Sequence, residues 1–178
     1  MKHILIISNI PAPYRVAQFR CLRETFPDWR VSVLYTGKSE ADRAWTSGGE
    51  GKDTYFLNSR ILSVKGGEVG GTATRFVHLP RGFTKKLNEL RPDVVIASEY
   101  NLSAVQALFW AKAHRIPYVN MTDGTLHSES YIGFAQKLTR RLIVSGADSY
   151  LASGSRAADK LLRWGAEEDR IAIAYLTV

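Results

Sequence analysis

Short apolar runs rich in β-branched residues alternate along this chain with longer segments of helical periodicity. This alternation is typical of βαβ units, in which a parallel sheet is covered by helices on both faces. We therefore expect a three-layer α/β/α sandwich with a mainly parallel sheet. The predicted strands are His3 to Ser8, Arg30 to Thr36, Tyr55 to Leu57, Val94 to Ser98, Tyr118 to Met121, Ser149 to Ala152 and Ile171 to Tyr175.

Helices are expected between most of these strands. The first begins at Pro13, because a first-turn proline loses no hydrogen bond. A second runs from about residue 102 to 114 with Asn101 as its N-cap, and a later one from about residue 155 to 164 ends at Gly165, a left-handed cap. The side chains expected to face the core are Val16, Phe19, Leu22 and Phe26 in the first helix, and Val105, Leu108 and Phe109 in the second.

The stretch from Gly37 to Arg81 breaks this pattern. It contains the segments SGGEG and KGGEVGG and shows little periodicity, which predicts long loops over one edge of the sheet, either functional or merely flexible. The whole chain has 178 residues, of which 45% are hydrophobic. That is enough for one substantial core, so residues 1–178 are expected to form a single domain.

Charge narrows the class of partner. The 24 Lys and Arg residues outnumber the 17 Asp and Glu residues, and the formal net charge of +7 favours anionic partners such as a phosphate-bearing lipid surface. Nucleic acid is not expected, because the sequence lacks a run of alternating basic and aromatic residues, zinc-finger spacing and a ribonucleoprotein-type strand.

The cysteine count and the first apolar run bear on the compartment. Cys21 is the single cysteine, which excludes an internal disulfide framework, and its helical setting predicts a buried thiol. The opening MKHILIIS is too short for a signal sequence or a membrane span, so we expect a cytosolic protein.

The first strand-to-helix turn tests for a dinucleotide cofactor. A dinucleotide fold places glycines there so that the backbone can approach a pyrophosphate, whereas this turn reads SNIPAPYR and has none. Proline removes an N–H donor and stiffens the turn. KGGEVGG is not followed by the Lys-Ser/Thr of a phosphate-binding loop, and no metal-ligand cluster stands out. We expect no cofactor and no metal.

Four segments together carry a family resemblance: SNIPAPYRVAQF, RPDVVIASEY, VNMTDGTLHSE and the closing RRLIVSGADSYLASGSRAADKLLRWGAEEDRIAIAYLTV. They resemble the N-terminal domain of a family-four retaining glycosyltransferase, whose B-type fold pairs two Rossmann-like domains. The resemblance implies that this chain is the acceptor-binding half, and that a C-terminal domain absent from it binds the nucleotide-sugar donor. The final run RIAIAYLTV, which reads as a strand leading onward, fits that expectation.

The implied reaction transfers a sugar to a saccharide or glycolipid acceptor with retention. Its transition state resembles an oxocarbenium ion, and the leaving diphosphate acts as the base. Such a site needs positioning and electrostatic stabilisation more than a protein nucleophile.

Candidate site residues follow from geometry, because open α/β sheets bind ligands at the carboxyl ends of their strands. Arg15 could bind a phosphate or an acceptor oxygen, or could be a solvated surface residue; Tyr14 could stack on a sugar or pack. The loop after Met121 is the densest polar cluster, and its alternative role is helix capping. The resemblance implies a histidine near the end of this strand that touches the donor sugar, and Asp123 stands nearest that place, whereas His127 comes later, so Asp123 is the catalytic candidate. Glu99 could bind the acceptor or be a plain loop carboxylate. The substrate-binding candidates are Tyr14, Arg15, Glu99, Tyr100, Thr122, Gly124, His127 and Glu129.

A helix from about Ser130 to Ser145 adds a possible contact with anionic lipid. Its basic face, Lys137, Arg140 and Arg141, would rest on the membrane or simply be solvated. The opposite, inward face is predicted to contain Tyr131, Phe134, Ala135, Leu138 and Leu142.

Two other functions remain open from the sequence. One is a non-catalytic Rossmann-like module for binding or membrane docking, which would work without a second domain. The other is half of a nucleotide-sugar epimerase, which would turn over a nucleotide sugar without an acceptor.

Overall fold

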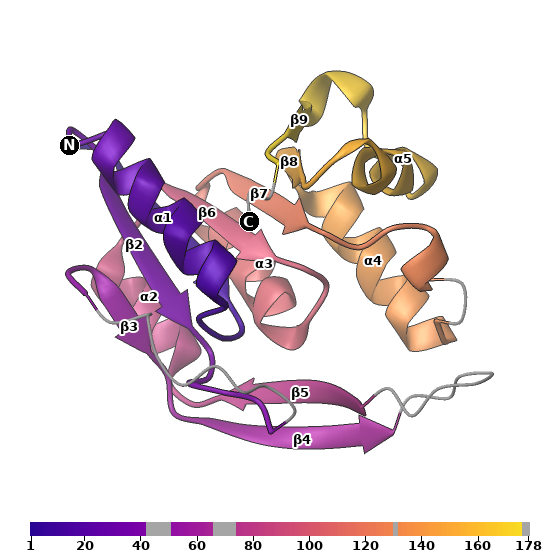
Figure 1. Ribbon diagram of the computed structural model, residues 1–178, viewed down its shortest axis with the longest axis horizontal. Coiled ribbons are helices and arrows are strands. Elements are labelled where there is room, and N and C mark those ends of the chain that lie inside the picture. Colours follow the sequence, from indigo (N-terminus) through magenta and orange to yellow (C-terminus); the bar gives the residue numbers. More distant parts are fainter. Residues whose placement is uncertain (42–50, 66–73, 130–131, 176–178) are drawn as a thin grey trace.

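The fold is a seven-stranded parallel sheet in the order β3-β2-β1-β6-β7-β8-β9 (Figure 1). The computed structural model describes residues 1–41, 51–65, 74–129 and 132–175. The predicted parallel α/β architecture is confirmed, and β9 is two residues shorter than expected. The strands are β1 (His3–Ser8), β2 (Arg30–Tyr35), β3 (Thr54–Phe56), β6 (Val94–Ser98), β7 (Tyr118–Thr122), β8 (Ser149–Ala152) and β9 (Ile171–Ile173).

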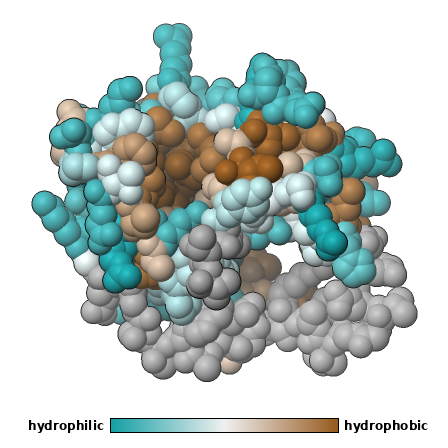
Figure 2. Space-filling view, turned by 45° about the horizontal axis from the view of Figure 1, so that its top comes forward, coloured by the Kyte–Doolittle hydropathy of each residue, from teal (hydrophilic) through white to brown (hydrophobic). Residues whose placement is uncertain are grey.

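Alternating side chains of the central strands form two cores, one on each face of the sheet. In β1, Leu5 and Ile7 join the larger core, whereas Ile4 and Ile6 join the smaller one. The smaller core is closed by α1 (Pro13–Thr25). Hydrophobic surface, brown in Figure 2, remains visible on one face of the molecule. The larger core is closed by α2 (Phe83–Leu90), α3 (Leu102–His114), α4 (Phe134–Gly146) and α5 (Ser155–Arg163).

Helix boundaries follow the predicted signals, but three burial predictions for α1 and α3 are wrong. Phe26, at the C-cap of α1, is 42% exposed instead of facing the core. Pro13 begins α1, and the Asn101 side chain caps α3 by accepting a hydrogen bond from the Ala104 N–H at 2.8 Å. Phe109 is 57% exposed instead of facing the core, because α3 buries its small residues together with Leu108 and Trp110. Cys21 is also exposed, since α1 buries only the stripe around Phe19.

The stretch expected to be long loops contains a β-hairpin, formed by β4 (Ser59–Lys65) and β5 (Thr74–Pro80). It lies below the main sheet in Figure 1. Both strands contain β-branched or aromatic residues, Ile61 and Val64 in β4 and Phe76 and Val77 in β5, a signal that the neighbouring glycines obscured. The two glycine-rich segments themselves lie largely outside the described residues.

The inward face predicted for the helix after residue 130 is wrong except at Leu142, which packs against the larger core. In α4, Phe134 and Leu138 are exposed, while Ile143 and Val144 are buried. Only the second half of the helix packs on the core, so burial shifts along the helix rather than following one stripe. Tyr131 lies outside the described residues.

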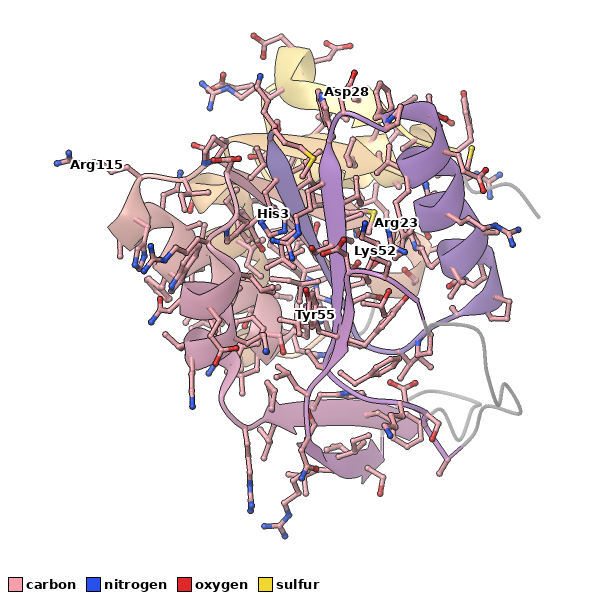
Figure 3. The ribbon with its side chains drawn as sticks, turned by 90° about the vertical axis from the view of Figure 1, so that its left-hand side faces the viewer. His3, Arg23, Asp28, Lys52, Tyr55 and Arg115 are labelled. Atoms are coloured by element: carbon pink, nitrogen blue, oxygen red, sulfur yellow. The ribbon has the colours of Figure 1, made fainter. Side chains whose placement is uncertain are left out.

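His3 makes stability depend on pH. Its ring is buried between strands (Figure 3), with Nε2 2.8 Å from the Ser32 hydroxyl, and burial, helped by the Arg30 charge, lowers the pKa of His3 below 6.5. Below that pH the unfolded chain binds a proton that the folded chain resists. We therefore expect the free energy of unfolding to fall as pH drops below about 6.5, and His3→Gln to remove this part of the slope. Urea unfolding at about pH 7 and about pH 5 measures the change in the free energy of unfolding with pH. If this change is no smaller in His3→Gln than in the exposed control His114→Gln, the prediction is contradicted.

Candidate functional site

A pocket of about 490 Å³ lies at the carboxyl ends of the central strands. Its walls come from the turn after β1, the segment after β2, the end of β6 and the loop after β7. This is the edge at which open α/β sheets bind ligands, and the volume is typical of a small-molecule site. The lining residues are Ser8, Asn9, Ile10, Ala12, Tyr14, Arg15, Glu40, Ser98, Glu99 and Asp123.

The turn after β1 is held rigidly in place. The Asn9 side chain accepts a hydrogen bond from Asn101 Nδ2 at 3.0 Å, and the Asn9 carbonyl accepts one from the Gly37 N–H at 2.8 Å. Pro11 and Pro13 supply no backbone donor on either side of Ala12. This wall of the pocket is therefore stiff, and it has few of the backbone N–H groups that would surround a diphosphate.

Arg15 and Asp123 form an ion pair across the pocket, although 108 positions separate them in sequence. The arginine side chain is only 7% exposed and the aspartate 32%. A second Arg15 nitrogen, Nη1, donates to Gln18 Oε1 at 2.8 Å. Arg15 is therefore neither a solvated surface residue nor an unengaged phosphate ligand, because its charge is already committed to Asp123.

Glu99 holds the loop after β7 in place through two hydrogen bonds. It follows β6 with a left-handed backbone (φ 62°), which turns its carboxylate toward the end of β7. Glu99 Oε1 accepts from the Asp123 N–H at 2.7 Å, and Oε2 accepts from the Thr122 hydroxyl at 3.1 Å. Burial raises the pKa of Glu99, and the Lys160 charge opposes that shift.

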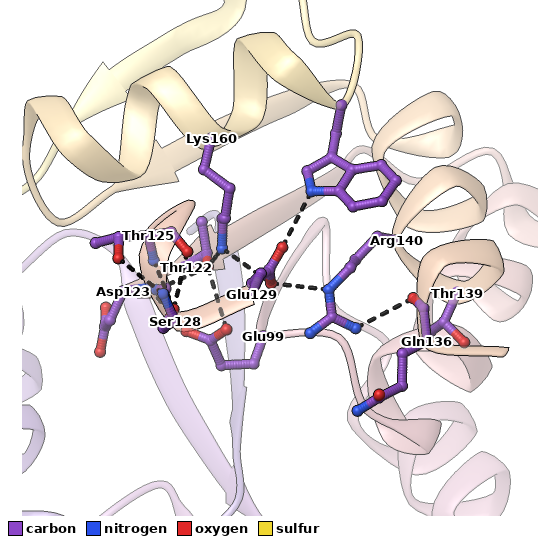
Figure 4. Close-up of polar contacts among 12 residues, drawn as sticks. Glu99, Thr122, Asp123, Thr125, Ser128, Glu129, Gln136, Thr139, Arg140 and Lys160 are labelled. Carbon is purple, nitrogen blue, oxygen red and sulfur yellow. Dashed lines mark hydrogen bonds and ion pairs between the residues drawn. The ribbon is translucent and has the colours of Figure 1, made fainter. Parts of the chain in front are cut away.

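Lys160 is fully buried, and its side chain extends from the helix toward Thr122 and Glu129 (Figure 4). It reaches from α5, donates to Thr122 Oγ1 at 2.6 Å and lies 3.7 Å from Glu129 Oε1. Burial lowers the pKa of Lys160, while Glu99 and Glu129 oppose the shift. A Cβ at position 124 would come within 2.8 Å of Lys160 Nζ, so the lysine also explains Gly124.

Glu129 belongs to this buried network rather than to the pocket wall. Its side chain is 8% exposed and accepts from Arg140 Nε at 2.8 Å and from Trp164 Nε1 at 3.0 Å. Arg140, expected on a lipid-facing surface, is therefore turned inward instead, with 12% of its side chain exposed. Tyr100 lies under the same cations, with Lys160 Nζ 4.7 Å from its ring centre.

The opposite wall of the pocket carries a second fixed carboxylate, Glu40. Glu40 Oε1 lies 2.9 Å from His78 Nε2, and His78 Nδ1 lies 3.1 Å from the Thr36 hydroxyl. A carboxylate only accepts, so Nε2 carries a proton, and Nδ1 is paired with the Thr36 hydroxyl. The hairpin thus contributes to the pocket by orienting Glu40 through the buried His78.

The structure divides the predicted site residues into three groups. Tyr14, Arg15, Glu99 and Asp123 line the pocket; Thr122, Gly124, Tyr100 and Glu129 lie in or against the network beneath it; His127 lies exposed on a short helical turn, η1 (His127–Glu129).

Sequence reasoning missed two residues that shape this region. Glu40 follows the second strand, so the carboxyl-end rule applied to that strand would have found it. Lys160 stands three residues after Ala157 and next to Leu161, on the inward face of its helix. A lysine at a helical position that faces the core is the sequence signal that could have identified this residue.

The pocket is rich in hydrogen-bond acceptors. Glu40, Glu99 and Asp123 supply carboxylates, and the charge of Arg15 is matched by Asp123. Within the part of the chain that the structure describes, no group of His, Cys, Asp and Glu side chains could hold a metal ion, and no helix is long and apolar enough to cross a membrane. The arrangement is suited to binding several hydroxyl groups of a neutral ligand.

A family model described as a glycosyl transferase 4-like domain matches residues 19–176. Similar solved structures include Anabaena HepE in complex with UDP and glucose (13% identity, 100% of this chain and 45% of that chain, TM-score 0.64). A second is S. aureus MnaA with UDP (18% identity, 97% of this chain and 44% of that chain, TM-score 0.62). A third is the UDP-N-acetylglucosamine 2-epimerase of Rickettsia bellii (17% identity, 99% of this chain and 45% of that chain, TM-score 0.61). The chain spans less than half the length of each of these structures. No curated protein matches the sequence.

Proposed function

The chain belongs to the glycosyl transferase 4-like domain family, and from this we propose that it is the acceptor-binding domain of a retaining glycosyltransferase. Its membership confirms the family that the sequence resembles, and the similar structures share the fold of one half of a B-type enzyme. In the proposed reaction a nucleotide sugar donates its sugar to a saccharide or glycolipid acceptor.

The observation that carries this proposal is the pocket of fixed carboxylates. Sugar hydroxyls are hydrogen-bond donors, and Glu40 and Asp123 present charged acceptors held by His78 and Arg15. Fixed acceptors bind with little loss of side-chain freedom. A diphosphate would meet carboxylates here instead of backbone N–H groups, which supports an acceptor site rather than a donor site.

In the proposed chemistry, the bond between the anomeric carbon and the donor phosphate oxygen breaks as the acceptor oxygen bonds to that carbon. The acceptor proton passes to the leaving diphosphate. Asp123 lies at the pocket surface, where its negative charge would stabilise the positive charge that develops on the sugar ring. Arg15 and Glu99 are positioning residues that hold Asp123 through its side chain and its backbone.

A second domain that binds the nucleotide sugar is part of the proposal. Its support is that the chain spans less than half of similar structures, several of which contain UDP or UDP-glucose. Immunoblotting the source cells for the native gene product tests it: a mass near twice that of this chain supports a donor domain, and a mass equal to that of this chain contradicts it.

Saccharide binding to the isolated chain gives a direct test of the pocket. We expect mono- and disaccharides titrated into the labelled chain to shift amide NMR signals of the turn after β1 and the loop after β7. Glu40→Gln should weaken binding about tenfold, because it removes a charged acceptor. The amide oxygen can still accept from His78. Exposed Glu89→Gln is the matched control, and equal weakening by both variants, or no shift in the pocket, would contradict the assignment.

A nucleotide-sugar epimerase is the second candidate. Of the similar structures named above, the Rickettsia bellii protein is a UDP-N-acetylglucosamine 2-epimerase, and S. aureus MnaA carries UDP. Incubating the full-length protein with a nucleotide sugar alone separates the two. Conversion of the sugar without an acceptor supports an epimerase, whereas conversion only after a saccharide is added supports transfer.

A further inference from the structure

The first half of α4 exposes large hydrophobic side chains to solvent. Phe134 is 83% exposed and Leu138 is 57% exposed. They stand four residues apart, so they lie on one side of the helix. A pair this exposed contributes nothing to the core and needs another explanation.

Two further leucines extend this apolar surface. Leu126, which precedes α4, is 46% exposed, and Leu162 in α5 is 40% exposed. Both line a surface pocket of about 580 Å³ between α4 and α5, together with Trp164. Apolar side chains gathered on one surface and surrounded by polar groups typically mark an interaction site.

Three cations border the same surface. Lys137, Arg141 and Arg163 line the pocket, and none of them forms an ion pair with a residue that the structure describes. Glu129 is the carboxylate of that pocket, and it is already paired with Arg140 and Lys160. The surface therefore has an excess of positive charge around its apolar centre.

We propose that this surface, formed by Leu126, Phe134, Lys137, Leu138, Arg141 and Arg163, docks onto an anionic membrane. Exposed aromatic and leucine side chains flanked by Lys and Arg are what an interfacial helix requires: the apolar groups enter the headgroup boundary and the cations meet lipid phosphates. A neutral apolar partner would leave the three cations unmatched. The surface is separate from the carboxylate pocket, so the inference does not depend on the proposed reaction.

Vesicle flotation with the full chain tests this docking. We expect binding to vesicles of equal parts phosphatidylcholine and phosphatidylglycerol, little binding to phosphatidylcholine alone, and release by high salt. Lys137→Gln/Arg141→Gln should weaken binding about thirtyfold, since each basic residue contributes about 1 kcal/mol and 1.4 kcal/mol is tenfold. Phe134→Ser/Leu138→Ser should also weaken it, and should retain the thermal unfolding midpoint of the wild type.

Matched controls remove the same groups elsewhere. Arg20→Gln/Lys85→Gln deletes two exposed charges on α1 and α2, and Phe109→Ser deletes a side chain as exposed as Leu138. Equal loss of binding in these controls would overturn the assignment of the surface, as would equal binding of the wild type to neutral and anionic vesicles. A wild-type dimer that Phe134→Ser/Leu138→Ser converts to monomer would instead assign the surface to a second copy of the chain and overturn membrane docking.

Discussion

Lys160→Met is expected to lower the free energy of unfolding by about 3–5 kcal/mol, the range for removing one partner of a buried ion pair. Methionine keeps the aliphatic stem, so the loss reports the ammonium group rather than a cavity. Without it, Thr122 loses a donor at 2.6 Å and Glu129 loses a cation 3.7 Å away, both in a site closed to solvent. Urea unfolding of the wild type and the variant measures the difference.

Lys112→Met is the matched control, because Lys112 also bonds a carboxylate, Asp148 Oδ1, at 2.7 Å, but both side chains are nearly half exposed. We expect this change to cost at most about 1 kcal/mol. Similar losses in the two variants would mean that the buried ammonium group of Lys160 stabilises the fold no more than an exposed one. A double-mutant cycle with Glu129→Gln should show non-additive losses, since both residues belong to one network.

Asp123→Asn in the full-length enzyme is expected to lower kcat about a hundredfold to a thousandfold, the effect of removing one group that stabilises transition-state charge. Asparagine keeps an oxygen that can accept from Arg15, so the geometry of the loop is retained while the negative charge is lost. The KM for the acceptor should change less than kcat, because the charge acts mainly on the transition state. Steady-state kinetics with both substrates varied separate the two effects.

Asp53→Asn is the control for this variant. Asp53 also pairs with an arginine, Arg30, at 2.7 Å, but far from the pocket lining. Its removal should leave kcat within about threefold of the wild type. If Asp123→Asn also stays within about threefold, Asp123 has no part in catalysis and the pocket serves binding alone.

The parallel sheet could be predicted from the sequence because its strands are buried on both faces and so read as continuous apolar runs. The pocket followed from the same prediction: carboxyl ends of parallel strands meet at one edge, which brings Tyr14, Arg15, Glu99 and Asp123 together. The hairpin was missed because nearby glycines suggested loops, although β4 and β5 contain the β-branched and aromatic residues that favour strands.

By itself, the sequence determined the α/β class, the glycine-free first turn and the side of the sheet that carries the site, because periodicity and chain order act locally. Tertiary structure decided which charges meet: Arg15 with Asp123, and Lys160 with Glu129. It also decided what covers each helix, turning Arg140 inward and leaving Phe134 in solvent. Helical spacing shows which residues share a face, whereas burial depends on elements distant in the chain that pack against it.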